Sequence, residues 1–322
     1  MHRAGLTGAQ EDQMAAAHRL LAVIAVLALV TLSMAPPRAI SQFDDWSLPV
    51  NIGPPINTAL AETAPCISRN GLSLYFVRTA AAGGFGGMDI WVSHRAGIDD
   101  DWGPPQNLGP MINTPFNDFG PSLSPDGHML YFASNRPGFG GNDLYISRRH
   151  NKRDDFGWQP SANLGIAINT AANEIAAAYF EDDLTGVITL YFASNRPGGF
   201  GGDDIYASTL LPDETFGAPV LVEELSTPSS DLQPAITRDG LEMFLSSSRP
   251  GTLGSLDLWV SPRSSTTDPW SVPMNLGAPV NSAGADARAS LSFDGTALYF
   301  QSNRGGNADF YRSTRSRLRD PE

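Results

Sequence analysis

The sequence predicts an all-β protein, a five-bladed β-propeller made of four-stranded antiparallel blades. Three observations support this fold class. A unit of three short strands and two turns is written five times along the chain, and a connector opens each copy. The copies recur at intervals of roughly 55 residues, the size of a propeller blade. The 32 Gly and 25 Pro residues interrupt the chain too often for long helices.

The first segment, residues 1–41, is predicted to be a signal peptide. Arg19 precedes an apolar run from Leu20 to Leu32, which is shorter than the roughly 20 residues that a membrane span needs. The site Ala39-Ile40-Ser41 then offers small residues for cleavage and would leave Gln42 as the new N-terminus. An uncleaved anchor is the alternative. Both interpretations place the remainder outside the cytoplasm, in the periplasm or the extracellular space.

Residues 42–315 are predicted to form the propeller, and residues 316–322 a C-terminal tail. Each repeat opens with an aromatic residue of the connector: Trp46, Trp102, Trp158, Phe216 and Trp270. An acid then heads the first strand: Glu62, Asp118, Glu174, Asp231 and Asp286. The third strand begins with an aspartate: Asp89, Asp143, Asp204, Asp257 and Asp309.

A hairpin is predicted between the first two strands of each repeat. The turn residues are Asn70-Gly71, Asp126-Gly127, a longer loop from Asp182 to Gly186, Asp239-Gly240 and Asp294-Gly295. Such pairs between apolar runs favour tight primed turns, which need positive φ.

The order of the strands also predicts how the ring closes. The chain starts on a connector strand, Trp46 to Ile52, and ends on a third strand, Asp309 to Ser313. The last blade therefore lacks a strand that the first repeat has in excess. We expect the N-terminal strand to complete the fifth blade and to leave only short, protected edges.

The run PSLSPDGHMLYFASNR, followed by Asp143-Leu144-Tyr145, resembles the TolB-like, WD-repeat-like propeller repeat of bacterial exported proteins. The resemblance covers Trp46 to Ser313. The added NLG…IN and GGFGG segments are similar to the variant often found beside OmpA-type domains. The resemblance implies a propeller located in the cell envelope. It is a weaker guide to the ligand, because proteins with this fold have many different functions.

Strand directions predict that three side chains of each repeat meet at one rim. They are the first-strand acid, an arginine after the second strand (Arg136, Arg196, Arg249 or Arg304) and the third-strand aspartate. We interpret each group as a structural brace in which the arginine holds two carboxylates. The alternative is a ring of carboxylates around the channel mouth that holds a cation or a sugar. The first repeat has Ala80 in place of the arginine, with Arg78 two positions earlier, so its cluster is expected to be looser.

Other residues offer little for catalysis, and no metal site or cofactor is predicted. Cys66 stands where other repeats have Ser or Ala, so it is interpreted as a buried filler. His94, His128 and His150 are expected at the face opposite the acidic rim, where they cannot join its carboxylates. The arginines after the last strand, among them Arg315, are interpreted as a solvated end.

The function predicted from these features is that of a non-catalytic, exported binding or scaffolding module, expected to be monomeric. Its partner would be an envelope protein, a peptide or a glycan, and it would bind to Phe85, Phe139 and Phe200 on mobile Gly-rich turns. The formal net charge of -13 argues against nucleic acid or an anionic membrane surface as a partner. The alternative is a glycoside hydrolase with carboxylates at the channel mouth. Its candidate acids are Glu62, Glu174, Glu223 and Glu224.

Overall fold

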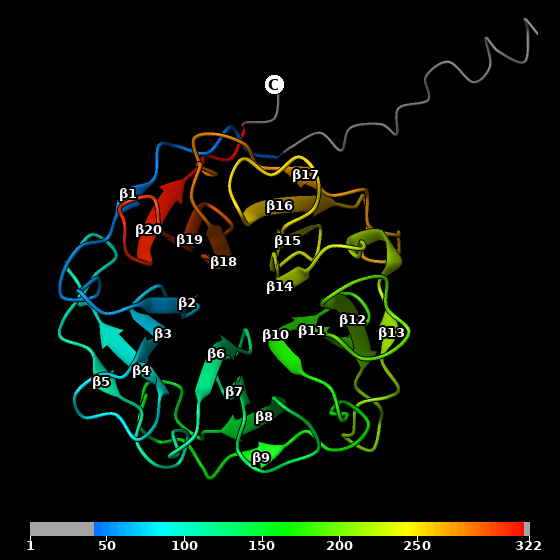
Figure 1. Cartoon of the computed structure of the whole chain (residues 1–322), viewed down its shortest axis with the longest axis horizontal. Coiled ribbons are helices and arrows are strands. Elements are labelled where there is room, and N and C mark those ends of the chain that lie inside the picture. The colour runs from blue at the N-terminus through cyan, green and yellow to red at the C-terminus, as the bar shows by residue number, and fades with distance from the viewer. Residues whose placement is uncertain (1–41, 319–322) are drawn as a thin grey trace, which may run out of the picture. The chain divides into compact units, whose positions relative to one another are not determined.

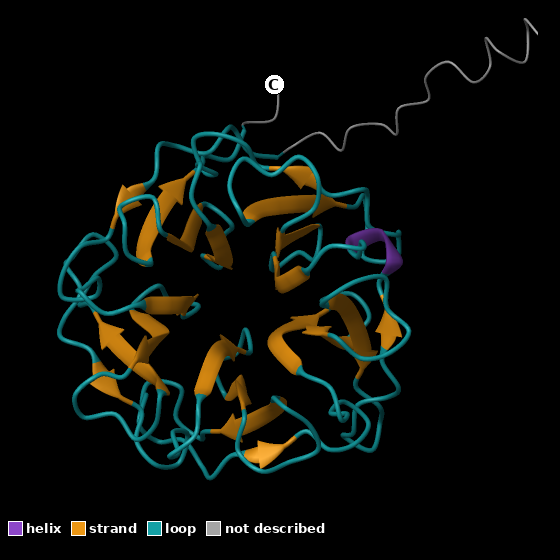
Figure 2. Ribbon diagram, in the orientation of Figure 1, coloured by secondary structure: helices purple, strands orange, loops and turns teal. Residues whose placement is uncertain are grey.

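The computed structural model describes residues 42–318, and the proposed signal peptide and residues 319–322 lie outside the described part. Residues 42–318 form five antiparallel sheets of four strands arranged as a ring (Figures 1 and 2), which confirms the predicted five-bladed propeller. No helix within these residues is long and apolar enough to cross a membrane.

Each blade runs outward from its inner strand. Blade 1 contains β2 (Glu62–Ile67), β3 (Ser73–Thr79), β4 (Met88–His94) and β5 (Gln106–Asn107). Blade 2 contains β6 (Asp118–Leu123), β7 (Met129–Ser134), β8 (Asp143–Arg148) and β9 (Ala162–Asn163). Blade 3 contains β10 (Glu174–Glu181), β11 (Ile188–Ser194), β12 (Asp204–Thr209) and β13 (Val220–Leu221), followed by the short 3₁₀ helix η1 (Glu223–Leu225). Blade 4 contains β14 (Asp231–Ile236), β15 (Glu242–Ser247), β16 (Asp257–Pro262) and β17 (Met274–Asn275). Blade 5 contains β18 (Asp286–Leu291), β19 (Ala297–Ser302) and β20 (Asp309–Thr314).

The N-terminal strand β1 (Val50–Asn51) completes blade 5, as predicted (Figure 1). It pairs antiparallel with β20, with Val50 opposite Arg312. Backbone hydrogen bonds extend the pairing on both sides, from the Ile52 N–H to the Phe310 carbonyl (3.1 Å) and from the Ser47 N–H to the Thr314 carbonyl (2.7 Å). The two ends of the propeller chain are therefore joined without a covalent bond.

The hydrophobic core lies between neighbouring blades. The aromatic pair of each second strand explains why, because consecutive strand residues point to opposite faces of the sheet. Tyr75 packs in a cluster with residues of blade 2, whereas Phe76 packs against blade 5, with its ring 5.7 Å from that of Phe310. Tyr131 and Phe132 repeat this arrangement one blade further on. Each blade thus contributes to two cores.

The hairpin turns lie where the sequence predicts them, but the prediction that they are tight primed turns is wrong. In blade 1 the Ser68 N–H donates to the Ser73 carbonyl (2.9 Å), so the loop spans four residues. Gly71 has φ +71°, and its N–H donates to the Ser68 carbonyl (2.8 Å). The side chain of Asn70 accepts the Leu72 N–H at 3.0 Å. This side-chain bond closes the wider turn, in which only the glycine needs a positive φ.

Every inner strand carries a β-bulge at its third residue, where the pairing register shifts. The bulge residue has positive φ in all five blades: Ala64, Gly120, Ala176, Gln233 and Arg288. Bulges re-aim side chains and bend the strand. These five residues line a central cavity of about 180 Å³.

Candidate functional site

The five first-strand acids are buried in ion pairs. The side chains of Glu62, Asp118, Glu174, Asp231 and Asp286 are 0% exposed. The ion pairs are Arg78–Glu62 (3.2 Å), Arg136–Asp118 (2.5 Å), Arg196–Glu174 (3.2 Å), Arg249–Asp231 (2.6 Å) and Arg304–Asp286 (2.6 Å). This geometry fits the structural brace, and it leaves a cation or sugar no access to these carboxylates.

Blade 4 illustrates how completely the acid is hydrogen-bonded. The carboxylate of Asp231 accepts the Thr227 N–H (2.6 Å), the Thr227 hydroxyl (2.7 Å) and the Ser247 hydroxyl (2.5 Å). Arg249 also donates to the Leu225 carbonyl (2.7 Å). The pair therefore joins the loop before the inner strand to the end of the second strand. A Thr or Ser four residues before the acid recurs in every repeat: Thr58, Thr114, Thr170, Thr227 and Ser282.

The prediction that each arginine holds two carboxylates is wrong. The third-strand aspartate instead binds the Gly-rich turn before it. In blade 2, Asp143 accepts the N–H groups of Phe139 (2.6 Å) and Gly140 (3.0 Å) and the side-chain amide of Asn163 (2.9 Å). The equivalent residues Asp89, Asp204 and Asp257 bind their own turns, and Asp309 accepts from Asn51 (2.9 Å). The N–H groups of the turn have no partner in a neighbouring strand, so they donate hydrogen bonds to this carboxylate.

The Gly-rich turns are anchored, contrary to the expectation that they are mobile. A Cβ on Gly140 would lie 2.1 Å from the Ala172 carbonyl oxygen of the next blade, so only glycine allows this approach. Phe85, Phe139 and Phe200 are 46%, 47% and 49% exposed. The three rings therefore offer apolar surface on fixed turns.

The first blade is not looser than the others. Arg78 stands on β3 opposite Glu62, at the position that other blades give to a serine such as Ser134. Its distance to Glu62 equals that of Arg196 to Glu174, at 3.2 Å. It also donates to the carbonyls of Pro55 (2.8 Å) and Ile56 (2.9 Å). Arg78, which stands directly opposite Glu62, therefore takes the role of the missing arginine.

A second set of arginines was missed by the sequence reasoning. Each guanidinium lies over the connector tryptophan that follows it in the ring: Arg95 over Trp102 (4.4 Å), Arg149 over Trp158 (4.3 Å), Arg263 over Trp270 (4.1 Å) and Arg315 over Trp46 (4.5 Å). Arg315 is only 8% exposed and pairs with Glu242, so its assignment to a solvated end is wrong. The available signal was that Arg95, Arg149 and Arg263 each stand shortly before a connector Trp in the sequence.

Cys66 is buried, and burial raises the pKa of its thiol to about 11. The thiolate that a nucleophile needs is therefore scarce at neutral pH.

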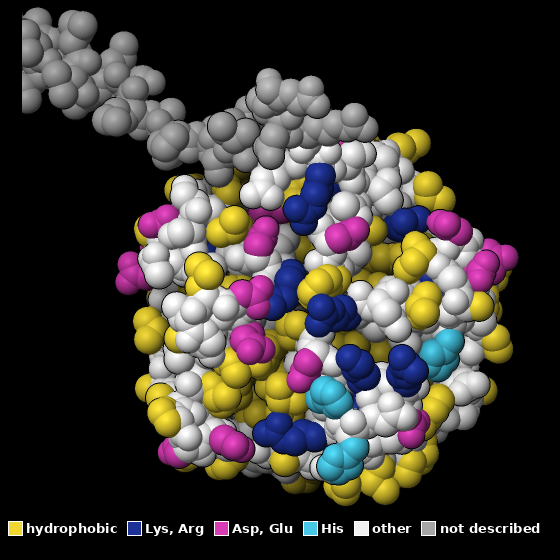
Figure 3. All heavy atoms as spheres, turned by 180° about the vertical axis from the view of Figure 1, so that it is seen from behind, with side chains coloured by type: hydrophobic (Ala, Val, Ile, Leu, Met, Phe, Trp, Pro, Cys, Tyr) yellow, Lys and Arg dark blue, Asp and Glu magenta, His cyan; other side chains and the backbone are white. Residues whose placement is uncertain are grey.

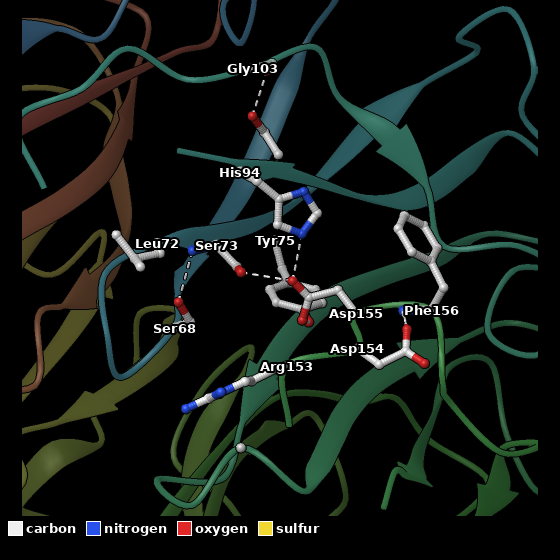
Figure 4. A network of polar contacts seen from close by, with 12 residues as sticks. Ser68, Leu72, Ser73, Tyr75, His94, Gly103, Arg153, Asp154, Asp155 and Phe156 are labelled. Atoms are coloured by element: carbon white, nitrogen blue, oxygen red, sulfur yellow. Dashed lines mark hydrogen bonds and ion pairs between the residues drawn. The ribbon is translucent and has the colours of Figure 1, made fainter. Parts of the chain in front are cut away.

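A polar network joins the loop after β8 to blade 1 (Figure 4). One oxygen of Asp155 accepts from the Ser73 hydroxyl (2.7 Å) and lies 2.6 Å from His94 Nε2. The other oxygen accepts from the Tyr75 hydroxyl and the Arg149 guanidinium. In a hydrolytic triad the histidine lies between the serine and the acid. Here Ser73 and His94 bind the same carboxylate oxygen, so the network clamps two blades together.

This network makes stability depend on pH. Burial alone would raise the pKa of Asp155, but hydrogen bonds from Tyr75, Ser73 and Arg149 outweigh it and hold the pKa below its usual value. Such a carboxylate stabilises the fold above its unfolded pKa of about 3.9, and this contribution is lost as the pH falls through the folded value. We expect the free energy of unfolding to fall more steeply below about pH 4 in the wild type than in Asp155→Asn, measured by urea titration. Parallel pH profiles would contradict this.

The central cavity is lined by the inner strands of all five blades. It extends to the hairpin side of the ring, where Arg69, Arg238 and Phe293 line it. Glu181, an exposed residue at the end of β10, also lines it. Figure 3 views the face that bears the described histidines, and Lys and Arg side chains gather around its centre. No group of three or more His, Cys, Asp or Glu among the described residues is arranged to hold a metal.

No protein-family model matches the sequence, and no match was found among curated proteins. Solved structures share the fold at low identity. An α-L-arabinofuranosidase from Lactobacillus brevis is 17% identical, with a TM-score of 0.58 over 81% of this chain and 92% of that chain. An endo-arabinase from Bacteroides thetaiotaomicron is 15% identical, with a TM-score of 0.59 over 86% and 99%. An arabinanase from Bacillus subtilis is 14% identical, with a TM-score of 0.55 over 83% and 97%. These matches establish that the chain has the fold of a five-bladed propeller.

Proposed function

We propose that this propeller is a glycoside hydrolase that acts on a carbohydrate polymer. The supporting observation is that propellers matching it over more than 80% of both chains are named arabinofuranosidase, endo-arabinase and arabinanase. This supports the hydrolase alternative from the sequence better than the non-catalytic module that the sequence favoured.

Glycoside hydrolysis needs two carboxylates that the substrate can reach. Glu62 and Glu174 do not qualify because their side chains are 0% exposed and paired with arginine. Glu223 and Glu224 are exposed on η1, which lies at the outer edge of the ring (Figure 2). Glu181 is exposed and lines the cavity, so it replaces them as the leading candidate acid.

The test is the release of reducing sugar from arabinan, arabinoxylan and linear xylan by the purified protein. We expect hydrolysis of at least one polymer, and a loss of about 100-fold in Glu181→Gln if this residue transfers a proton. Glu223→Gln is the matched control because it removes an exposed carboxylate at the outer edge, and its activity should equal that of the wild type. An inactive wild type on every polymer would overturn the proposal.

A non-catalytic binding module is the second candidate, and the burial of nine of the ten repeat carboxylates, all but Asp309, favours it. Phe85, Phe139 and Phe200 would then bind an envelope protein, a peptide or a glycan. If the protein binds a polymer but releases no sugar from it, the binding module is favoured over the hydrolase.

We further infer that the chain is an exported, TolB-like envelope protein, on the basis of its repeat motif and the apolar segment Leu20 to Leu32. Mass spectrometry of the protein from its native host should find an N-terminus at or near Gln42. A chain that keeps Met1 in the cytoplasmic fraction would exclude export.

A further inference from the structure

The central cavity is not symmetric, although the backbone around it is. The bulge residue has φ between 54° and 66° in all five blades. Blades 1, 2 and 3 place Ala64, Gly120 and Ala176 there, which leaves the cavity open on that side. Blades 4 and 5 place Gln233 and Arg288 there, on the adjacent inner strands β14 and β18. A left-handed φ is unfavourable for such long side chains, and strain of this kind is characteristic of functional sites.

Both side chains lack a polar partner within residues 42–318. The Oε1 atom of Gln233 is buried and accepts no hydrogen bond. The guanidinium of Arg288 makes no hydrogen bond or ion pair in this part of the chain, and only its backbone N–H has a side-chain partner, the Ser246 hydroxyl (2.9 Å). Burial lowers the pKa of Arg288 to about 10, so its guanidinium is still charged at neutral pH. Arg288 differs from Arg78, Arg136, Arg196, Arg249 and Arg304, each of which is paired with a carboxylate.

Arg288 is partly buried on the cavity wall, and a guanidinium there without a carboxylate partner favours the binding of an anion. Glu181 also lines the cavity, but its carboxylate accepts a hydrogen bond from the Tyr179 hydroxyl (3.3 Å) and, within residues 42–318, forms no hydrogen bond or ion pair with Arg288. At the hairpin side of the cavity, Arg69 lies over the Phe293 ring at 4.0 Å, and Arg238 also lines the wall. An anion entering from this face would pass Arg69 and Arg238, of which Arg238 is paired with Asp183, on a chain whose net charge is -13.

We infer that the cavity binds a sugar acid, whose carboxylate accepts from the Arg288 guanidinium and whose hydroxyl donates to Gln233 Oε1. The volume of about 180 Å³ is far more than the ~15 Å³ that one water needs. The pair of Gln233 and Arg288 matches this ligand because one offers an acceptor and the other a charged donor. The inference rests on the proposed function in that the ligand is a carbohydrate, and it narrows the substrate class to uronate-containing glycans.

The test is isothermal titration calorimetry with digalacturonate, its methyl ester and the neutral disaccharide of the same linkage. We expect the acid to bind at least 10-fold more tightly than the ester or the neutral sugar. In Arg288→Gln that preference should disappear, and in Gln233→Leu affinity for the acid should fall several-fold. Arg153→Gln, which removes an exposed arginine outside the cavity, is the control and should leave all affinities unchanged.

The melting temperature separates a ligand site from a structural role. Because Arg288 has no partner, Arg288→Gln should melt at or above the wild-type temperature, whereas a marked fall would show that Arg288 stabilises the fold and would overturn the inference. Equal affinity for acid and ester, or binding of a peptide carboxylate but not of the uronate, would overturn it as well. Uronate binding without hydrolysis would keep this inference and refute the hydrolase. Hydrolysis of neutral arabinan without uronate binding would support the hydrolase and refute this inference.

Discussion

Deletion of residues 42–52 is expected to lower the free energy of unfolding by about 5 kcal/mol, since burying each large apolar side chain contributes roughly 1.5–3 kcal/mol. Phe43 is buried against Arg315, Trp46 packs with the core between blades 4 and 5, and Ile52 packs with the core between blades 5 and 1. The deletion also leaves the outer edge of β20 unpaired. Urea denaturation of the deleted and intact chains would measure the loss.

The matched control keeps the strand and changes only its exposed side chains. Leu48 and Val50 are 74% and 66% exposed, so the double variant Leu48→Ser, Val50→Thr should unfold within about 1 kcal/mol of the wild type. A deleted chain as stable as this control would show that the N-terminal strand does not close the ring.

The variant Arg249→Ala is expected to lose about 3–5 kcal/mol of stability, the usual result of removing one partner from a buried ion pair. The Arg249 side chain is 7% exposed and that of its partner Asp231 is 0% exposed. The change would leave a carboxylate without its counter-charge and the Leu225 carbonyl without a donor. Equilibrium unfolding of both proteins measures the difference.

Arg238→Ala is the control for this prediction. Arg238 pairs with Asp183, whose side chain is 66% exposed, so solvent screens the pair and the loss should stay below about 1 kcal/mol. Similar losses in the two variants would mean that burial does not determine the strength of these pairs.

The fold was predictable because each repeat carries several independent signals. The aromatic pair of the second strand, the Gly-containing turn and the surplus N-terminal strand are all local patterns, and the structure confirms the propeller and its closure. The acid–arginine pairing was predictable from strand direction, which places the two residues at the same end of the hairpin.

What the sequence could not supply were contacts set by side-chain reach. Arg136 follows β7, and Asp143 begins the neighbouring strand β8. The carboxylate of Asp143 nevertheless accepts hydrogen bonds from N–H groups of the Gly-rich turn and does not pair with Arg136. Asp155 contacts blade 1 from a loop of blade 2, which no repeat pattern indicates. Arg288 occupies a position filled by Gly or Ala in three repeats, and its significance emerges only when the bulge directs it into the cavity.

The central claim is that the first-strand acids are structural and not catalytic, and Glu174→Gln tests it most directly. This change keeps the shape of the side chain but removes the charge that pairs with Arg196. Thermal unfolding and polymer hydrolysis at low temperature should be measured on the same preparation. The account predicts a melting temperature lower by roughly 10 °C and unchanged hydrolysis per folded molecule. An unchanged melting temperature with hydrolysis abolished would contradict it and make the buried acid a catalytic residue.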